Sequence, residues 1–140
     1  MKSILVVGVR GLPEVEGGVE KHAERLFPLI AREGWAICVA GMKPFLQSGQ
    51  YHGVRLWRAP SLGLLQIDRW LYAAATLVKA VRMRPDIVHF ARLESAALLL
   101  AYKLIGCKTV VRYGADCDAH PWSGPRKWTL RGAQYQLRWA

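Results

Sequence analysis

The sequence is poor in the features that mark secreted, disulfide-linked or membrane-spanning chains. Its 140 residues include three cysteines, Cys38, Cys107 and Cys117, and no CxxC pair, which disfavours a disulfide scaffold or a zinc ribbon. No run of residues reaches the roughly 18 apolar positions that a membrane-spanning helix needs. A strand-like segment begins at Ile4 without the basic region and cleavage site of a signal peptide. These absences predict a cytoplasmic protein with reduced thiols.

Acidic residues are also scarce. Ten Asp and Glu stand against 20 Lys and Arg, which gives a net charge of +10. Such a surplus favours an anionic partner: nucleic acid, an acidic membrane surface or a phosphorylated substrate. Nucleic-acid recognition would need aromatic residues on adjacent strands or a helix lined with Arg and Lys, and we find neither pattern. We therefore expect no nucleic-acid partner.

The sequence does contain short apolar runs, and 52% of its residues are hydrophobic, which excludes a disordered chain. Four runs are continuous and rich in β-branched residues, as is typical of parallel strands buried on both faces. They are Ile4–Gly8, Ala36–Ala40, Ile87–Phe90 and Thr109–Arg112. A fifth candidate, Val54–Ala59, alternates apolar and polar residues and is expected nearer a sheet edge.

Helical patterns separate these runs, each with apolar residues at 3.6-residue spacing. The first stripe comprises Val19, Ala23, Leu26, Phe27 and Ile30, with Pro28 expected to bend or loosen its helix. The second comprises Ile67, Leu71, Ala74, Val78 and Val81. The third comprises Ala97, Leu98, Ala101, Leu104 and Ile105. A last helix is expected over Pro125–Ala140.

This alternation of strands and helices predicts an α/β fold in a single domain over residues 1–140. We expect a Rossmann-like, doubly wound and mostly parallel sheet of about five strands. Ligands bind such sheets outside the carboxyl ends of the strands. The loops after Gly8, Phe90 and Arg112 are therefore the candidate sites.

The loop after the first strand carries most of the chemical signal. Four glycines flank this strand–helix junction: Gly8, Gly11, Gly17 and Gly18. The first amides of a helix have no internal partner and bind phosphate readily. Neither GxxxxGK[ST] nor GxGxxG is present, so the P-loop and the dinucleotide fingerprint are disfavoured. From the residues alone, the glycines either make a simple turn or build a phosphate site.

Three segments together carry a family resemblance. The segments are GVRGLPEVEGGVE at 8–20, RPDIVHF at 84–90 and GCKTVVRYGADCDAHPWSGPRKW at 106–128. They resemble the N-terminal domain of the GT-B glycosyltransferases of family 4, close to the rhamnosyltransferase-like branch. The resemblance implies a hexosyltransferase-type enzyme of polysaccharide biosynthesis that needs no metal or other cofactor. In that family an acceptor-side domain faces a nucleotide-sugar-binding domain across a cleft.

The resemblance also implies roles for particular residues. The donor phosphate would be bound by Gly17, Gly18 and Arg10. The acceptor or the sugar would contact Glu20 and His89. The catalytic positions would be Tyr113, where the family usually has His, and Asp116. The family's C-terminal donor-binding domain has no counterpart in the sequence, so we expect this acceptor-side domain to be incomplete and inactive alone.

Two further clusters lie in the last third of the chain. Asp116, Cys117, Asp118 and His120 are close together, but their spacing fits no common ligand pattern, so we expect no metal. The second cluster combines Trp122, Trp128 and Trp139 with Arg126, Lys127, Arg131 and Arg138. It indicates either a peripheral contact with the anionic inner face of the membrane or a bare inter-domain face prone to self-association.

Three functions follow from these observations. The favoured one is the acceptor-side domain of an enzyme that moves a sugar from a nucleotide-sugar to a saccharide or lipid-linked acceptor. The alternative is a stand-alone, non-catalytic Rossmann-like module that binds phosphate or a nucleotide-sugar. A basic protein that binds membranes or nucleic acid is the third.

Overall fold

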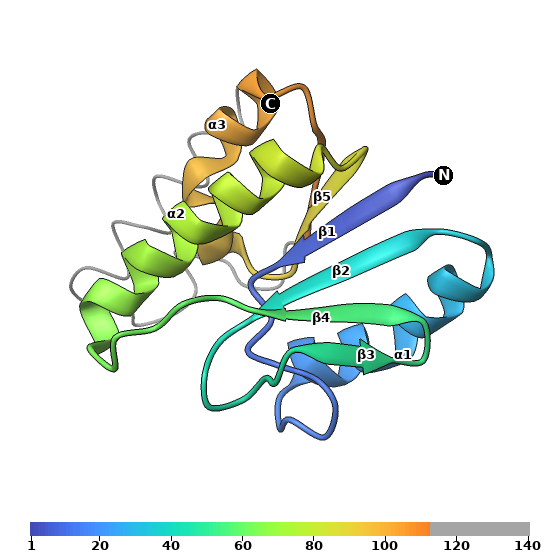
Figure 1. Ribbon diagram of the computed structural model, residues 1–140, viewed down its shortest axis with the longest axis horizontal. Coiled ribbons are helices and arrows are strands. Elements are labelled where there is room, and N and C mark those ends of the chain that lie inside the picture. Colours follow the sequence, from blue (N-terminus) through green and yellow to red (C-terminus); the bar gives the residue numbers. More distant parts are fainter. Residues whose placement is uncertain (113–140) are drawn as a thin grey trace, which may run out of the picture.

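The computed structural model describes residues 1–112, apart from the side chains of residues 65, 66, 93, 94 and 97. Within this range the chain forms one sheet of six strands (Figure 1). The strands are β1 (Ser3–Val7), β2 (Ala36–Gly41), β3 (Gly49–Tyr51), β4 (Val54–Arg58), β5 (Ile87–Phe90) and β6 (Lys108–Val111). Their order is β3-β4-β2-β1-β5-β6, and every neighbouring pair is parallel except β3 and β4.

The predicted Rossmann-like, mostly parallel α/β sheet is confirmed, but its strand count is six rather than about five. The strand missed from the sequence is β3, the antiparallel edge strand that pairs with β4. It has only three residues, Gly-Gln-Tyr, two of them exposed. A segment with no buried apolar run gives no periodic signal, so its pairing depends on the neighbouring strand.

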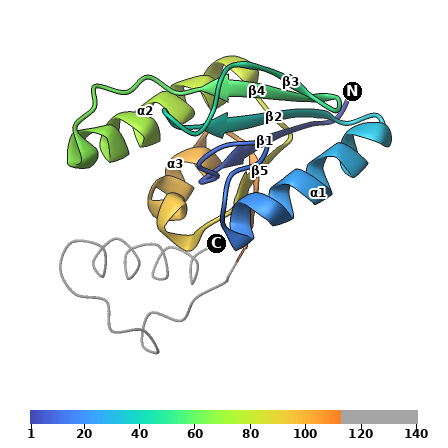
Figure 2. The same ribbon diagram turned by 90° about the horizontal axis from the view of Figure 1, so that it is seen from below.

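Helices cover both faces of the sheet (Figure 2). They are α1 (Gly18–Arg32), α2 (Leu65–Met83) and α3 (Leu99–Leu104), the last preceded by the 3-10 helix η1 (Leu93–Leu98). Val6 and Val39 pack with Phe27 of α1 on one face. Leu5 and Cys38 pack with α2 and α3 on the other face. The central strands β1 and β2 are therefore buried on both sides, as their continuous apolar runs predicted. The run at Thr109–Arg112 is different: it forms the edge strand β6, in which Lys108 and Val110 are exposed.

Helix α1 follows its predicted stripe. Ala23 and Phe27 are buried, and Val19, Leu26 and Ile30 are partly buried against the same core. The helix continues through Pro28, which is itself buried, to Arg32. The apolar side of α1 is thus the side that packs on the sheet.

Helix α2 does not follow its predicted stripe. The side chains that pack on the sheet are Tyr72, Thr76 and Ala80, whereas Ile67 and Val78 are each 50% exposed. Tyr72 is fixed in this orientation because its hydroxyl accepts from Gly8 N–H (3.0 Å) and donates to the carbonyl oxygen of Ala40 (2.7 Å). The assignment of the Ile67–Val81 stripe as the packed face is therefore wrong. The packed side has apolar residues of its own, Leu77 and Met83, and the Tyr72 hydrogen bonds favour it further.

The expected last helix at Pro125–Ala140 lies outside the described residues, as do Tyr113, Asp116 and the clusters around them. Across residues 1–112, none of the helices combines the length and apolar character that a bilayer crossing requires.

Candidate functional site

The site is built at the carboxyl edge of the parallel strands, where the loop after β1 meets the start of α1 and the loop after β5. The Gly8–Tyr72–Ala40 hydrogen bonds tie the ends of β1 and β2 together at this edge. The backbone N–H of Met42 donates to the carbonyl oxygen of Arg10 (2.8 Å), so the loop after β2 supports the loop after β1. Hydrogen bonds therefore link the ends of β1 and β2 and the loops that follow them at this edge.

Its centre is the Glu20 cluster, formed by Glu20, Arg10 and Arg92. Glu20 is fully buried, and its Oε1 accepts from Arg10 N–H (3.2 Å) and Arg10 Nε (3.1 Å). The same oxygen accepts from Arg92 Nη2 at 2.7 Å. The two arginine side chains keep about a third of their surface exposed, at 35% and 29%. Two guanidinium groups at the surface thus share one buried carboxylate.

The environment of Glu20 keeps its carboxyl group ionised. Burial by itself raises the pKa of this group, because it disfavours the charged form. Hydrogen bonds from the Arg10 side chain and backbone, aided by Glu20's own backbone and the Arg92 charge, outweigh burial and lower the pKa below its ordinary value. With one negative and two positive groups, the Glu20 cluster carries a net positive charge at neutral pH and suits an anion.

The adjacent glycines at the start of α1 have different structural reasons. Gly17 is the N-cap residue with φ 137°, and a Cβ there would overlap Glu20 Oε2. Its lack of a side chain therefore makes room for the Glu20 cluster. A Cβ on Gly18 would meet nothing within 4 Å. Gly18 leaves the surface open beside the first helical turn, which has no side-chain cap.

Arg10 is held by several partners, which limits what else it can bind. Besides Glu20, its Nη2 donates to the carbonyl oxygen of Glu16, and its guanidinium lies 5.3 Å from the ring centroid of Phe45. Arg10 lies beside the Gly17–Gly18 helix start, as its predicted role requires. Its role as a phosphate ligand remains a prediction.

His89 lies in a different environment from the Glu20 cluster. It is the third residue of β5, on the face covered by α1, with its ring edge-on to Phe27 at 5.4 Å. Its Nε2 is buried and has no hydrogen-bond partner within residues 1–112. Burial, followed by the charges of His22 and Arg112, lowers its pKa. These contacts tie His89 to the packing under α1, and its contact with an acceptor remains a prediction.

Arg92 is the residue of the site that sequence reasoning missed. It stands two residues after β5, on one of the three loops that the strand pattern marked as candidates. A basic residue directly after a buried parallel strand was the available signal. Its pairing with Glu20, 72 positions away in sequence, needed the tertiary structure.

The structure describes Arg10, Gly17, Gly18 and Glu20 close together at one edge, while Tyr113 and Asp116 lie outside the described residues. Among the side chains that the structure describes, no three from His, Cys, Asp or Glu gather as a metal site would require.

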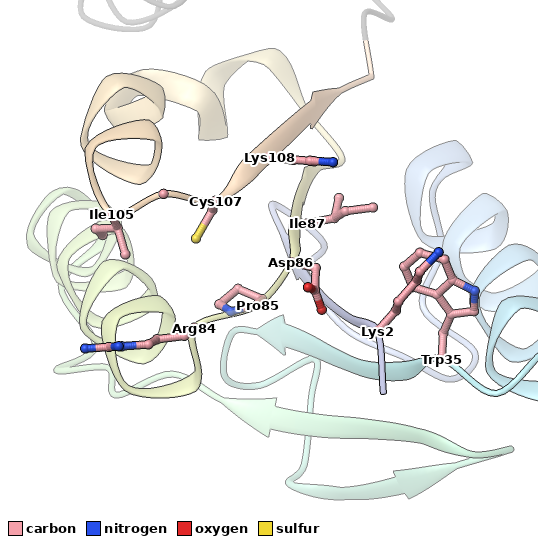
Figure 3. Close-up of a pocket in the computed structure, with 10 residues that line it drawn as sticks. Lys2, Trp35, Arg84, Pro85, Asp86, Ile87, Ile105, Cys107 and Lys108 are labelled. Atoms are coloured by element: carbon pink, nitrogen blue, oxygen red, sulfur yellow. The ribbon is translucent and has the colours of Figure 1, made fainter.

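A hollow of about 350 Å³ opens at the opposite, amino edge of the sheet (Figure 3). Two of its charged groups have internal partners: Asp86 accepts from Ser3 N–H (2.7 Å), and the Lys2 ammonium lies 5.3 Å from the Trp35 ring centroid. Arg84 and Lys108 point apart in Figure 3. Because no polar groups converge in this hollow, we take the Glu20 cluster as the better site.

Comparison with known proteins adds no relative: no family model matches the chain, and a search of curated proteins finds no match.

Proposed function

We propose that the chain is the N-terminal, acceptor-side part of a glycosyltransferase. The enzyme would move a sugar from a nucleotide-sugar to a saccharide or lipid-linked acceptor without a metal ion. On this proposal a second Rossmann-like domain delivers the nucleotide-sugar, and the chain alone is inactive. The observation that carries the proposal is the uncapped start of α1 at Gly17–Gly18, next to two arginines that share the Glu20 carboxylate.

This arrangement suits a leaving diphosphate. As the bond between the sugar carbon and the diphosphate oxygen breaks, negative charge grows on that oxygen. The amides at the start of α1, which has no side-chain cap, together with the net positive Glu20 cluster, would stabilise that charge as it develops. Gly18 would let the phosphate approach these amides closely, because no side chain stands there.

Two buried polar atoms favour a sugar as the other ligand. Within the described residues, Glu20 Oε2 and Arg92 Nε are buried without hydrogen-bond partners. A sugar hydroxyl can donate to the carboxylate oxygen and accept from the guanidinium N–H. An unmade hydrogen bond at a buried polar atom is costly, so a ligand that reaches these atoms as the arginine side chains move and completes their bonds gains affinity.

The test is sugar transfer by the full product of the gene, with a matched pair of variants. Gly18 and Gly49 both have open space where a side chain would stand, and neither has a positive φ, so Gly18→Glu and Gly49→Glu each add one negative charge without strain. We expect Gly18→Glu to lower kcat/KM at least about tenfold through repulsion of the diphosphate. Gly49→Glu on β3 should leave it unchanged, as should a chelator. Equal effects of the two variants would contradict a diphosphate site at α1.

The alternative is a non-catalytic module that binds phosphate or a nucleotide-sugar. The presence of Tyr113 where the family usually has His favours it, because a tyrosine does not titrate near neutral pH. Calorimetry with UDP and with sugar phosphates separates the two functions. The module requires binding by the 140-residue chain, weakened by Gly18→Glu, with no transfer by the full gene product.

A further inference from the structure

The solvent-facing side of α2 is apolar and is left uncovered within the described residues. We call it the α2 outer face, which includes the loop residues just before the helix. Its exposed members are Leu62, Leu64, Ile67, Trp70, Val78 and Val81, each 49–69% exposed. Exposed apolar patches of this kind mark protein or membrane contacts.

The geometry of α2 places this face directly away from the sheet. Val78 lies two residues from both Thr76 and Ala80, which are fully buried, and two residues turn the helix by about 200°. From Ile67 to Val81 the apolar positions recur every three or four residues, over about 21 Å of helix. The stripe is therefore continuous and points into solvent.

The charges around this face are almost all positive. Arg82 is exposed one turn after Val78, on the same side of α2, and Arg58 is exposed at the end of β4, just before the loop that leads into α2. The acidic residue of α2, Asp68, is already engaged: its carboxylate accepts from the Ser61 hydroxyl (2.7 Å) and from Leu62 N–H (2.7 Å). The surface thus combines an apolar stripe with basic flanks.

We propose that the α2 outer face docks on an anionic lipid bilayer. The apolar side chains enter the boundary between headgroups and acyl chains, where tryptophan is favoured, and the arginines meet headgroup phosphates. Charge selects this occupant over a second copy of the chain. Pairing two such faces would bring arginines of both copies together in molecules that each carry +10.

The position of α2 relates this surface to the candidate site. The helix follows the parallel strand β4, so it begins at the carboxyl edge of the sheet, and Figure 2 shows its start projecting past that edge. The α2 outer face therefore begins at the edge that holds the Glu20 cluster, although α2 and α1 cover opposite faces of the sheet. Under the proposed function, a lipid-linked acceptor would reach the site around this edge, and docking itself requires no transfer chemistry.

The experiment is co-sedimentation of the 140-residue chain with phosphatidylcholine vesicles, with and without phosphatidylglycerol. We expect binding to the anionic vesicles only, weakening as salt rises. Ile67→Ser with Trp70→Ser should lower the partition coefficient at least about tenfold. The control pair Leu29→Ser with Leu104→Ser removes exposed apolar side chains from α1 and α3 and should leave it unchanged.

A second variant pair separates local from overall charge. Arg58→Glu with Arg82→Glu should weaken binding at least about tenfold. Arg25→Glu with Arg32→Glu makes the same change in net charge on α1, away from the α2 outer face, and should weaken it far less. All variants should keep the wild-type circular dichroism spectrum, because none of the changed side chains is buried.

Three results would overturn the proposal. One is absence of binding to anionic vesicles. Another is wild-type binding by the α2 variants together with loss of binding in Trp128→Ser with Trp139→Ser, which would assign the contact to the C-terminal segment. The last is a dimer in light scattering that the α2 variants convert to a monomer, which would make the face a protein interface. Vesicle binding by the chain, together with no sugar transfer by the full product of the gene, would refute the proposed function alone.

Discussion

Helices α1 and α2 both pack on the sheet, but they turn their apolar stripes in opposite directions. Helix α1 buries its apolar stripe, with Phe27 only 2% exposed, and Glu20 is the charged side chain that it buries as well. Helix α2 buries Tyr72 and Thr76 and leaves Ile67 and Val78 half exposed. The comparison shows that an apolar stripe identifies a helix but does not decide which side packs, because specific hydrogen bonds can select the other side.

The largest expected effect contrasts the two stripes directly. Phe27→Ala removes a buried ring between α1 and the sheet and should cost about 3–5 kcal/mol of unfolding free energy. Val78→Ala should change it by less than about 0.5 kcal/mol, because Val78 faces solvent. Urea denaturation of both variants measures this. A comparable loss in Val78→Ala would mean that the α2 outer face is packed in solution.

The next largest effect concerns the polar group that α1 does bury. Glu20→Gln keeps the shape of the side chain but removes the charge that Arg10 and Arg92 share, and should cost about 2–4 kcal/mol. Glu33→Gln, at the exposed end of α1, is the control and should be neutral. The loss of stability in Glu20→Gln should shrink at acidic pH. The pKa of Glu20 is lowered on folding, so its contribution is present above the unfolded value of 4.5 and lost as pH falls through the folded value.

A smaller effect tests the polar side of α2. Thr76 Oγ1 accepts from the Tyr102 hydroxyl (2.9 Å), and burial raises the pKa of Tyr102 to about 12. Thr76→Val leaves that hydroxyl without its acceptor and should cost about 1–2 kcal/mol. The reverse exchange two positions away, Val78→Thr, should be nearly neutral. If thermal unfolding shows equal losses, the buried hydrogen bond does not select the face of α2.

The smallest effect is the pH dependence that His89 adds under α1. Its pKa is lowered on folding by burial, so the unfolded chain binds the proton more readily. Stability should therefore fall as pH drops below the unfolded value of 6.5, by about 1 kcal/mol or less near pH 5.5. His89→Phe should flatten the change in Tm between about pH 7.5 and about pH 5.5. An unchanged slope in this variant would show that His89 is accessible to water.

Much of this arrangement could be predicted from local patterns. The continuous apolar runs identify the parallel strands, since burial on both faces requires them, and the alternating β4 was correctly expected near the edge. The candidate loops after β1 and β5 follow from the rule that ligands bind at carboxyl edges. Arg92 and the short strand β3 could not be found, because neither lies in a periodic pattern and their places depend on contacts that form only in the folded chain.

By itself, the sequence determined most of the elements, the sheet class and the glycine-rich start of α1, because these depend on residues that are neighbours along the chain. Only the tertiary structure decided that Arg10 and Arg92 share Glu20, and that Gly17 is needed for space while Gly18 is open. It also decided that α2 turns its apolar stripe outward. The physical reason is the same in each case. Burial and hydrogen bonding act between groups that folding brings together, and the spacing of apolar residues along the chain does not specify these long-range contacts.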